Sequence, residues 1–441
     1  MASVKAVGHR PDRVALSSRR AVAAASVGNV LEIYDFIAYG IFAVPISRTF
    51  FPASSDFAAL ILTFITFAVG FLVRPVGALV LGRYADRAGR KKALSLTLLL
   101  MAAGTVVPAV CPSFASIGIA APLVIVLGRL IQGFSAGGEI GGTVAMLVEN
   151  APPSRKGLFG SFQQMSQGGG TLIAGFVGLA LTSLFTQEQI FGGAWRLAFA
   201  FGLLIGPVGW YIRRSVDETP VFEQSQRLPR RALWTQLVEY RSQVATGVAI
   251  MVFWTIATYV SNYFTTYAVR EVHLSLFDSY VGQVSYGIAM MTMCPIIGHL
   301  SDRIGTRTPM LIGAALTAIA AYPLFVLLSH YPGLATLVAV QVTIAILLAC
   351  YAACASSVLG EVFPTEFRAT GVGFAYAIGV TVFGGFTPVA VTTLIGFTGD
   401  RLVIGYYLAA AALISCVPVL FMSKGKGKGN PEPDTAQAQL E

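Results

Sequence analysis

The chain has 441 residues, of which 55% are hydrophobic and only 12% are charged, and its mean hydropathy is +0.71. Because a soluble domain carries about twice that density of charged residues, the composition excludes an ordinary soluble protein. The net charge of +9 forms no single basic patch with interleaved aromatic residues, which excludes a nucleic-acid-binding surface. We therefore predict a protein of the lipid bilayer with no nucleic-acid partner.

Long apolar runs recur along the whole sequence, each close to the length that crosses a hydrocarbon core. They are rich in helix-forming residues and glycine and lack the alternation of barrel strands, so we predict an all-α integral membrane fold. Twelve transmembrane helices are expected, at residues 21–49, 57–82, 93–110, 119–149, 158–184, 193–213, 243–269, 278–299, 309–329, 334–361, 370–397 and 401–422. The first run lacks a small-residue cleavage site, so it is interpreted as a helix and not as a signal peptide.

Lysine and arginine are distributed unevenly between the connections. If both termini lie in the cytoplasm, 24 of the 30 basic residues fall in cytoplasmic segments. Four fall in outer loops, and two lie inside predicted spans. By the positive-inside rule, we expect a multi-pass protein of the cell inner (plasma) membrane with both termini cytoplasmic.

The sequence contains an internal repeat. GRYADRAGRKK at 82–92 and GHLSDRIGTRT at 298–308 share Gly, Asp, Arg and Gly at an offset of 216 residues. A second pair, ENAPPSRKGLFG at 149–160 and EVFPTEFRATGVG at 361–373, follows the fourth span of each half. A duplicated six-helix unit is the architecture of a secondary transporter. The predicted organisation is a cytoplasmic N-terminal segment (1–20), an N-terminal six-helix half (21–213), a cytoplasmic linker (214–242), a C-terminal six-helix half (243–422) and a disordered cytoplasmic tail (423–441).

Several stretches resemble one protein family. GRYADRAGRKK resembles the loop 2–3 signature of the major facilitator superfamily, and GRLIQGFSAGGEIGG at 128–142 resembles its helix 4 signature. Four further stretches resemble the metabolite–proton symporter branch of this superfamily, which includes carriers for citrate, α-ketoglutarate, shikimate and betaine. They are GNVLEIYDF (28–36), GFLVRPVGA (70–78), residues 361–371 and FGGFTPVAVTT (383–393). FFPASSDFAALILTF (50–64) and FGGFTPVAVTT look closest to the citrate and tricarballylate carriers. The resemblance covers about residues 25–420 and implies the major facilitator fold, with two pseudo-symmetric six-helix halves.

The resemblance also implies a function. We expect a secondary active transporter that imports a small organic polycarboxylate, citrate or a related tricarboxylate, together with protons by alternating access. Three alternatives stay open: symport of α-ketoglutarate, shikimate or betaine, coupling to sodium instead of protons, and a substrate-sensing receptor on a transporter fold. The protein is expected to function as a monomer.

Other functional classes lack their sequence signals. A membrane-embedded enzyme is disfavoured because the chain has no HExxH motif, paired histidines, nucleophile elbow or phosphate loop. A channel is disfavoured because the chain has no filter loops or repeated charge rings. The five cysteines show no metal-ligand spacing, so we expect no metal and no cofactor.

Charged residues inside the spans are the first functional candidates. A charge at the bilayer centre costs roughly 2.5–3.5 kcal/mol and normally has a partner. Glu32 and Asp35 are three residues apart, which places them on one face of helix 1, and Arg74 and Arg129 are the cations available inside the spans. If an arginine moves onto a substrate anion, the carboxylate that it leaves takes up a proton. With the family's pattern, this predicts the ion-coupling residues Glu32, Asp35, Arg129 and Glu139, whose alternative role is to fix helix register as internal salt bridges.

Polar side chains in the spans predict the substrate site. Arginine forks hold carboxylates, and tyrosine and amide donors suit the remaining oxygens of a polycarboxylate. The predicted substrate-binding residues are Asn29, Tyr39, Arg74, Arg129, Gln132, Gln163, Gln164, Gln167, Tyr259, Asn262, Tyr263 and Tyr376. The alternative for the glutamines is hydrogen bonding between neighbouring helices. Whether Arg74 or Arg129 is the main substrate ligand stays open.

The repeated loop signature predicts a gate. Its residues are Gly82, Asp86, Arg87, Gly89, Arg90, Asp302 and Arg303. Asp86 and Arg90 are expected to latch helices 2 and 3 against a neighbouring helix in the outward-open state. Thr306 stands where a basic residue is usual in the second copy, which predicts a weaker C-terminal gate. The alternative is that these short basic loops only enforce topology.

Overall fold

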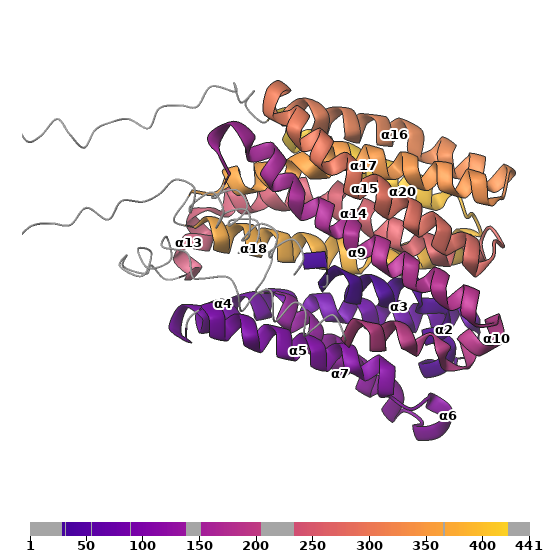
Figure 1. Ribbon diagram of the computed structural model, residues 1–441. Helices are drawn as coiled ribbons and strands as arrows, with labels where there is room; N and C mark the ends of the chain where they lie inside the picture. Colours follow the sequence, from indigo (N-terminus) through magenta and orange to yellow (C-terminus); the bar gives the residue numbers. More distant parts are fainter. Residues whose placement is uncertain are drawn as a thin grey trace, which may run out of the picture.

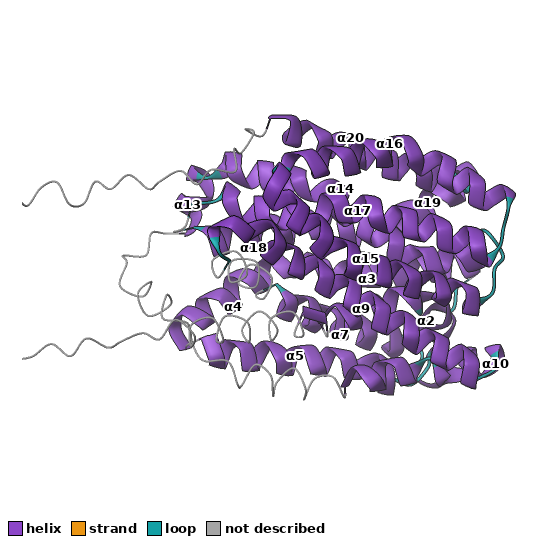
Figure 2. Ribbon diagram, turned by 45° about the horizontal axis from the view of Figure 1, so that its top comes forward, coloured by secondary structure: helices purple, strands orange, loops and turns teal. Residues whose placement is uncertain are grey.

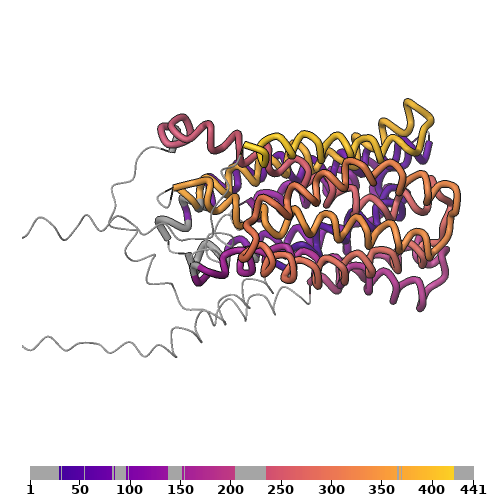
Figure 3. Tube along the Cα trace, turned by 90° about the horizontal axis from the view of Figure 1, so that it is seen from above, coloured from indigo at the N-terminus to yellow at the C-terminus, as the bar shows by residue number. Residues whose placement is uncertain are grey.

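The computed structural model describes residues 29–30, 32–53, 55–88, 90–137, 151–203, 233–364 and 367–421. Within these ranges the chain forms helices joined by short connections and contains no β-strand (Figure 2). The helices run side by side along the length of the molecule (Figure 3). The prediction of an all-α fold is confirmed.

The helices follow one another closely along the chain. In the N-terminal part they are residues 29–41 without 31, α2 (Ala43–Phe50), α3 (Asp56–Leu72), α4 (Arg74–Ala88), α5 (Arg90–Val110), α6 (Phe114–Ile117), α7 (Ala120–Ala136), the 3-10 turn η1 (Pro153–Arg155), α9 (Lys156–Leu184), α10 (Gln187–Gln189), the π-helical η2 (Ile190–Ala194) and residues 196–203. In the C-terminal part they are α13 (Leu233–Glu239), α14 (Arg241–Arg270), α15 (Leu276–Ile304), α16 (Arg307–His330), α17 (Leu334–Val362), α18 (Arg368–Gly379), the π-helical η3 (Val380–Gly385), α19 (Thr387–Thr398) and α20 (Val403–Phe421).

Each of the twelve predicted spans coincides with helix in the part of the chain that the structure describes. Eight helical stretches there are long and apolar enough to cross a membrane, and two shorter apolar helices cover Leu99–Val110 and Ala120–Ala136. The first span is described only over residues 29–49 without 31, the fourth only over 119–137 and the sixth only over 193–203. The transmembrane architecture thus agrees with the sequence.

Local capping explains where several helices begin and end. The Ser55 hydroxyl accepts a hydrogen bond from the backbone N–H of Ala58 at the start of α3, at 3.2 Å. Ser275 does the same for Asp278 at the start of α15, at 3.0 Å. These serines satisfy N–H groups that have no partner inside the helix. At the C-terminus of α19, Gly399 ends the helix with a φ of 66°, a left-handed conformation that favours glycine.

Two groups of helices meet along a long interface. Figure 1 shows α3, α4, α5 and α7 in one group and α14 to α20 in the other, with α9 along the boundary. Helix α9 packs against α15 and α17, while α3 and α4 pack against α18, η3 and α19. Glycines allow α9 and α15 to approach closely, since a Cβ on Gly287 would lie 2.7 Å from the backbone nitrogen of Leu172. The interface is thus built from α3–α4 and α9 on one side and α15, α17, α18, η3 and α19 on the other.

The predicted span at 57–82 is interrupted, which the sequence analysis did not anticipate. Helix α3 ends at Leu72 and α4 starts at Arg74. The physical reason is Pro75, which has no N–H to donate to the carbonyl oxygen of Phe71 four residues earlier. The Thr381 hydroxyl of η3 donates to that oxygen instead, at 2.7 Å. Two irregular helices, one from each group, therefore meet at the same level.

Matched arginine contacts support the internal repeat. The Arg196 guanidinium donates to the carbonyl oxygens of Ala109 and Cys111, at the end of α5. The Arg401 guanidinium donates to the carbonyl oxygen of Ser329, near the end of α16, and to that of Glu271. In each group an arginine near the start of the last helix thus caps the C-terminal carbonyls of the third helix, where a cation is favourable.

The two ends of the molecule differ in basic residues. At the end that we call the basic end lie Arg155, Lys156, Arg241, Arg303, Arg307 and Arg368. At the opposite end lie Arg48, Arg196, Arg270 and Arg401.

Candidate functional site

A cavity lies between the two groups of helices, about halfway along them. Helix 29–41, α4 and α9 form one side of it, and α14, α15 and α18 form the other. Its volume is about 30 Å³, which is room for about two water molecules and not for a tricarboxylate. The described conformation is therefore contracted around the site, and a substrate of that size requires the cavity to widen.

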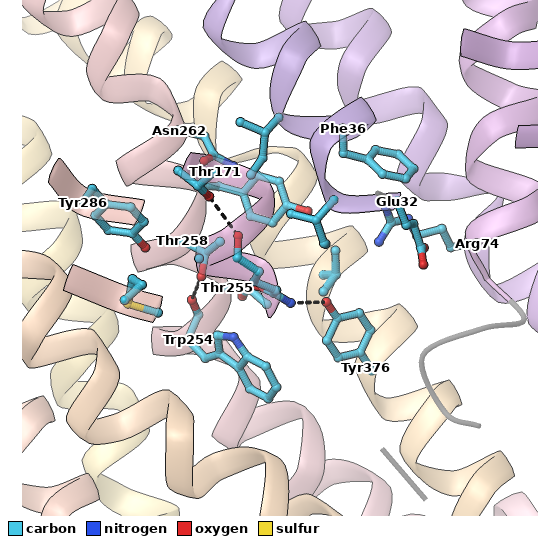
Figure 4. Close-up of a pocket in the computed structure, with 17 residues that line it drawn as sticks. Glu32, Phe36, Arg74, Thr171, Trp254, Thr255, Thr258, Asn262, Tyr286 and Tyr376 are labelled. Atoms are coloured by element: carbon cyan, nitrogen blue, oxygen red, sulfur yellow. Dashed lines mark hydrogen bonds between the residues drawn. The ribbon is translucent and has the colours of Figure 1, made fainter. Parts of the chain in front are cut away.

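Six of the predicted site residues line this cavity: Glu32, Arg74, Gln167, Tyr259, Asn262 and Tyr376. The sequence analysis missed other side chains that line it with them, among them Phe36, Thr171, Trp254, Thr255, Thr258 and Tyr286 (Figure 4). An aromatic or hydroxyl side chain in an apolar helix is indistinguishable from core in the sequence alone, which is why these residues gave no signal.

Arg74 is buried in an aromatic corner of the cavity. Its guanidinium carbon lies 4.3 Å from the ring centre of Phe36 and 4.2 Å from that of Phe71. The Nε atom has no hydrogen-bond partner within the described chain. Glu32 lies beside Arg74 on the same wall (Figure 4). A guanidinium held against ring faces keeps its charge and offers its N–H edge to a carboxylate.

Polar groups on the other walls face the same space. The Gln167 amide donates to the Tyr376 hydroxyl at 3.5 Å, which links α9 to α18 across the cavity (Figure 4). The Tyr376 ring packs edge-on against Trp254, with ring centres 5.8 Å apart. The Oδ1 atom of Asn262 is buried and has no partner among the residues that the structure describes. Among the residues that the structure describes, the cavity thus combines one arginine, one carboxylate and several neutral donors and acceptors.

A second polar cluster lies away from the cavity. Arg129 on α7 donates through Nη1 to the Gln132 side-chain oxygen at 2.6 Å. The Gln132 amide donates to the Thr105 hydroxyl of α5 at 3.0 Å, and that hydroxyl donates to Oδ2 of Asp35 at 2.7 Å. All four side chains are buried, and no direct ion pair joins Asp35 to Arg129 within the described residues. Arg129 and Gln132 were expected at the substrate site, and the structure places them in this chain of hydrogen bonds, which we call the Asp35 cluster.

Glu32 and Asp35 therefore face different surroundings, although they share one side of the helix. Glu32 lines the cavity, whereas Asp35 points to α5 and α7. Thr105 connects Asp35 to the rest of the cluster and was missed by the sequence analysis. A threonine hydroxyl normally bonds a backbone oxygen of its own helix, so its sequence carries no sign of a partner from another helix.

The remaining predicted ligands lie between helices. Asn29 donates to the Ser166 hydroxyl at 2.6 Å. Tyr39 stacks on Arg129, with 3.7 Å from the guanidinium carbon to the ring centre, and Tyr263 accepts from the Thr392 hydroxyl at 3.1 Å. Gln163 accepts from the Ser356 hydroxyl at 3.4 Å, and both amide atoms of Gln164 are buried without a partner in the described part of the chain. Glu139 lies outside the described residues.

Contacts between the two groups also lie near both ends of the molecule, away from the cavity. At the basic end, Asp302 of α15 accepts hydrogen bonds from the backbone N–H groups of Gly157 and Leu158 at the start of α9, at 2.6 and 3.1 Å. At the opposite end, Arg270 donates to the carbonyl oxygen of Asp56 at 3.2 Å. Arg303 is exposed. Gly89 and the side chains of Asp86, Arg87 and Arg90 fall outside the described residues, and Gly82 lies within α4.

The chain matches two family models and many known transporters. The model described as "Sugar (and other) transporter" matches residues 21–232, and the model described as "Major Facilitator Superfamily" matches residues 281–440. The citrate–proton symporter of Klebsiella pneumoniae is 37% identical over 397 residues, which cover 90% of this chain and 89% of that protein. This chain belongs to the major facilitator superfamily. The predicted family is thus confirmed, and the protein is a transporter and not an enzyme.

Other members of the superfamily are similar at lower identity. The proline/betaine transporter of Escherichia coli (strain K12) is 29% identical over 420 residues, covering 92% of this chain and 83% of that protein. The structure of the xylose transporter XylE from E. coli in a partially occluded inward-open conformation matches with a TM-score of 0.77 at 18% identity, covering 94% of this chain and all of that one. This likeness confirms the major facilitator fold of a multi-pass membrane protein.

Proposed function

We propose that this protein is a symporter that imports citrate or a related tricarboxylate together with protons by alternating access. The observation that carries the proposal is Arg74, a buried cation in a cavity between the two halves, with Glu32 beside it. The similarity to citrate–proton symporters over most of the chain supports the same substrate.

Arg74 is the proposed anion ligand. One carboxylate of the substrate binds its N–H edge, where Nε has no partner among the described residues, and the hydroxyl and amide groups of Tyr259, Asn262 and Tyr376 serve the remaining oxygens. Gln167 turns from Tyr376 to the substrate as the cavity widens. We assign Arg129 to the Asp35 cluster and not to the substrate, because it does not line the cavity.

Two carboxylates are proposed to carry the coupled protons. When the substrate anion binds Arg74, Glu32 loses the nearby positive charge and takes up a proton, which restores the charge balance of the cavity. Asp35 provides the second site, and Arg129 balances its charge through Gln132 and Thr105. Sodium is the alternative ion, and uptake driven by a pH gradient without sodium tests it.

Alternating access requires each end to open in turn. Opening at the basic end separates Asp302 from the start of α9, and opening at the opposite end separates Arg270 from Asp56. We assign gating to Asp302 because of its contact with α9, and to the loop at 82–90 because the internal repeat makes it the counterpart of the segment that contains Asp302.

We propose that the protein lies in the inner membrane of the cell with its basic end facing the cytoplasm. A single chain is proposed to suffice for transport.

The deciding experiment is a calorimetric screen of the purified protein against citrate, tricarballylate, aconitate, α-ketoglutarate, shikimate and betaine, followed by uptake into proteoliposomes under an imposed pH gradient. Citrate or tricarballylate binding with gradient-driven accumulation is expected. Binding without any transport would identify a receptor, and α-ketoglutarate binding alone would move the protein to the dicarboxylate carriers.

Betaine is the second candidate, and the cavity itself favours considering it. Trp254, Tyr259 and Tyr376 present aromatic rings to the cavity, and such rings bind quaternary ammonium groups. Glu32 could balance that positive charge. The screen separates the two proposals, because betaine binding without any polycarboxylate binding overturns the citrate assignment.

A further inference from the structure

The Thr105 hydroxyl occupies the centre of the Asp35 cluster. It is buried on α5 and lies within hydrogen-bond distance of three polar atoms. These are Oδ2 of Asp35 at 2.7 Å, the carbonyl oxygen of Met101 at 3.0 Å and Nε2 of Gln132 at 3.0 Å. Asp35 receives no other side-chain hydrogen bond in the described part of the chain, and its Oδ1 has no partner there.

The number of protons and lone pairs in this arrangement is informative. The Gln132 nitrogen can only donate, so the Thr105 oxygen accepts from it. The hydroxyl has a single proton and two acceptors within reach, the Asp35 carboxylate and the Met101 carbonyl oxygen. When Asp35 is ionised, the Thr105 proton points to the carboxylate. When Oδ2 is protonated, Asp35 donates to Thr105 and the Thr105 proton turns to Met101.

Both protonation states of Asp35 therefore keep the Asp35–Thr105 and Gln132–Thr105 hydrogen bonds without moving a heavy atom, and the bond to the Met101 carbonyl oxygen is made when Asp35 is protonated. The hydroxyl oxygen then accepts from Gln132 and from Asp35, which uses its two lone pairs. A buried hydroxyl or carboxyl left without a partner costs free energy, so this rotation removes a barrier to protonation inside the protein.

The surroundings leave Thr105 as the group best placed for this role. From α7, Arg129 is the charged group that faces the cluster, and it is engaged by Gln132. From helix 29–41, Tyr34 is directed away, because its hydroxyl donates to the carbonyl oxygen of Ala198 at 2.7 Å. Residues 196–203 present Gly202, where a Cβ would lie 2.6 Å from Oδ1 of Asp35. The helix therefore packs directly onto the carboxylate.

We propose that Thr105 is a positioning residue for proton coupling, whose hydroxyl reverses its hydrogen bond as Asp35 gains and loses the proton. The proposal rests on the proposed proton symport. It assigns Thr105 no contact with substrate, so its loss should alter the dependence on pH and leave citrate binding intact.

The test compares Thr105→Val, Thr105→Ala and Thr105→Ser with the wild-type protein in proteoliposomes. Citrate uptake is measured over a series of external pH values, and citrate counterflow at constant pH measures movement without net proton transfer. Thr317→Val is the matched control, because Thr317 is buried on α16 and its hydroxyl bonds only the Gly313 carbonyl oxygen of its own helix in the described structure.

Without the hydroxyl, the ionised carboxylate loses its donor and the proton is held more tightly. The pH midpoint of uptake should therefore move upward by about one unit in Thr105→Val and Thr105→Ala. Gradient-driven accumulation should fall about tenfold while counterflow is kept, and Thr105→Ser should restore the wild-type profile. The Ala variant is smaller than the native residue, so it tests the hydroxyl without crowding.

Three results would overturn the assignment: unchanged profiles in both the Val and Ala variants, an equal shift in Thr105→Ser, or an equal shift in Thr317→Val. Failure of the proposed function is a separate outcome, because it appears in the wild-type protein as citrate uptake that ignores the pH gradient. A wild-type protein that responds to the gradient, together with an unresponsive Thr105 series, refutes only the role of Thr105.

Discussion

Asp302 lies 2.6 Å, through its Oδ1 atom, from the backbone nitrogen of Gly157, so a side chain of one half caps the first turn of a helix in the other. A carboxylate at a helix N-terminus is favourable because of the unpaired N–H groups and the helix dipole. A Cβ on Gly157 would lie 2.8 Å from the same oxygen, and the glycine thus permits the close approach. This contact joins the two halves at the basic end.

Asp302→Asn should shift the protein toward the state that is open at the basic end. Loss of the charge weakens the cap by about 1 kcal/mol, which corresponds to about a fivefold shift in population. The measurement is the alkylation rate of a cysteine introduced at Ser356, which is buried on α17 and donates a hydrogen bond to Gln163 of α9. The control is Asp278→Asn, on the same helix at the opposite end. An alkylation rate that rises equally in both variants would argue against a latch.

Arg74→Lys should weaken citrate binding while leaving the fold intact. Lysine keeps the charge but cannot offer a fork, so the loss of one charged hydrogen bond is expected to cost about 1.5–3 kcal/mol, or about 10- to 150-fold in Kd. Titration calorimetry measures this. Arg48→Lys is the control, since Arg48 is exposed and forms an ion pair with Asp56 at 3.5 Å. Unaltered affinity in Arg74→Lys would move the anion site elsewhere.

Asp35→Asn should bind citrate and exchange it across the membrane but should not accumulate it. The amide keeps the shape of the carboxylate and its hydrogen bond with Thr105, yet it cannot carry a proton. Accumulation under a pH gradient and counterflow without one distinguish the two activities. Asp56→Asn serves as the exposed control. If Asp35→Asn still concentrates citrate, the residue only holds helices together.

Arg196→Leu and Arg401→Leu should each lower the thermal stability of the purified protein. Each variant leaves carbonyl oxygens at the end of a helix without their cation, at a cost of about 1–3 kcal/mol. The Arg48→Leu variant, which removes only an exposed ion pair, should cost less than about 1 kcal/mol. Temperature-dependent aggregation ranks the three. Equal stability of all three proteins would mean that the matched contacts are incidental.

An alkaline phosphatase fusion after Ser423 should be inactive, because both termini are proposed to lie in the cytoplasm. The asymmetry of Lys and Arg between the two ends is the reason. A fusion after Pro332, between α16 and α17 at the opposite end, should be active and serves as the control. Activity of the Ser423 fusion would invert the topology.

The sequence predicted the helices and the family because apolar length and the repeated loop are local properties of the chain. Arg74 and Glu32 were equally visible, since a charge in an apolar run needs a partner. The surroundings of these charges were not visible in the sequence. The spacing of three residues placed Glu32 and Asp35 on one side of a helix, but only the packing of α5 and α7 around Asp35 separates it from the cavity.

Thr105 and Trp254 show what sequence patterns leave out. Thr317, Thr255 and Thr105 all donate or can donate to a backbone oxygen four residues earlier, so the three look alike in the sequence. Thr105 differs because Asp35, 70 residues away, lies within reach of its hydroxyl. In the sequence, Trp254 looks like an ordinary core residue of an apolar helix. Only the packing of α14 beside α18 places its side chain at the cavity.

The missing N–H of Pro75 gives the interface a pivot. Residue 75 donates no helical hydrogen bond to Phe71, which favours bending between α3 and α4 at this point, and the facing η3 is itself an irregular, π-helical turn. Arg74 is the first residue beyond that joint, so a tilt of α4 would move its guanidinium relative to the other walls of the cavity. An anion bound to Arg74 would therefore act directly on the orientation of α4. Binding strength and helix tilt would then change together.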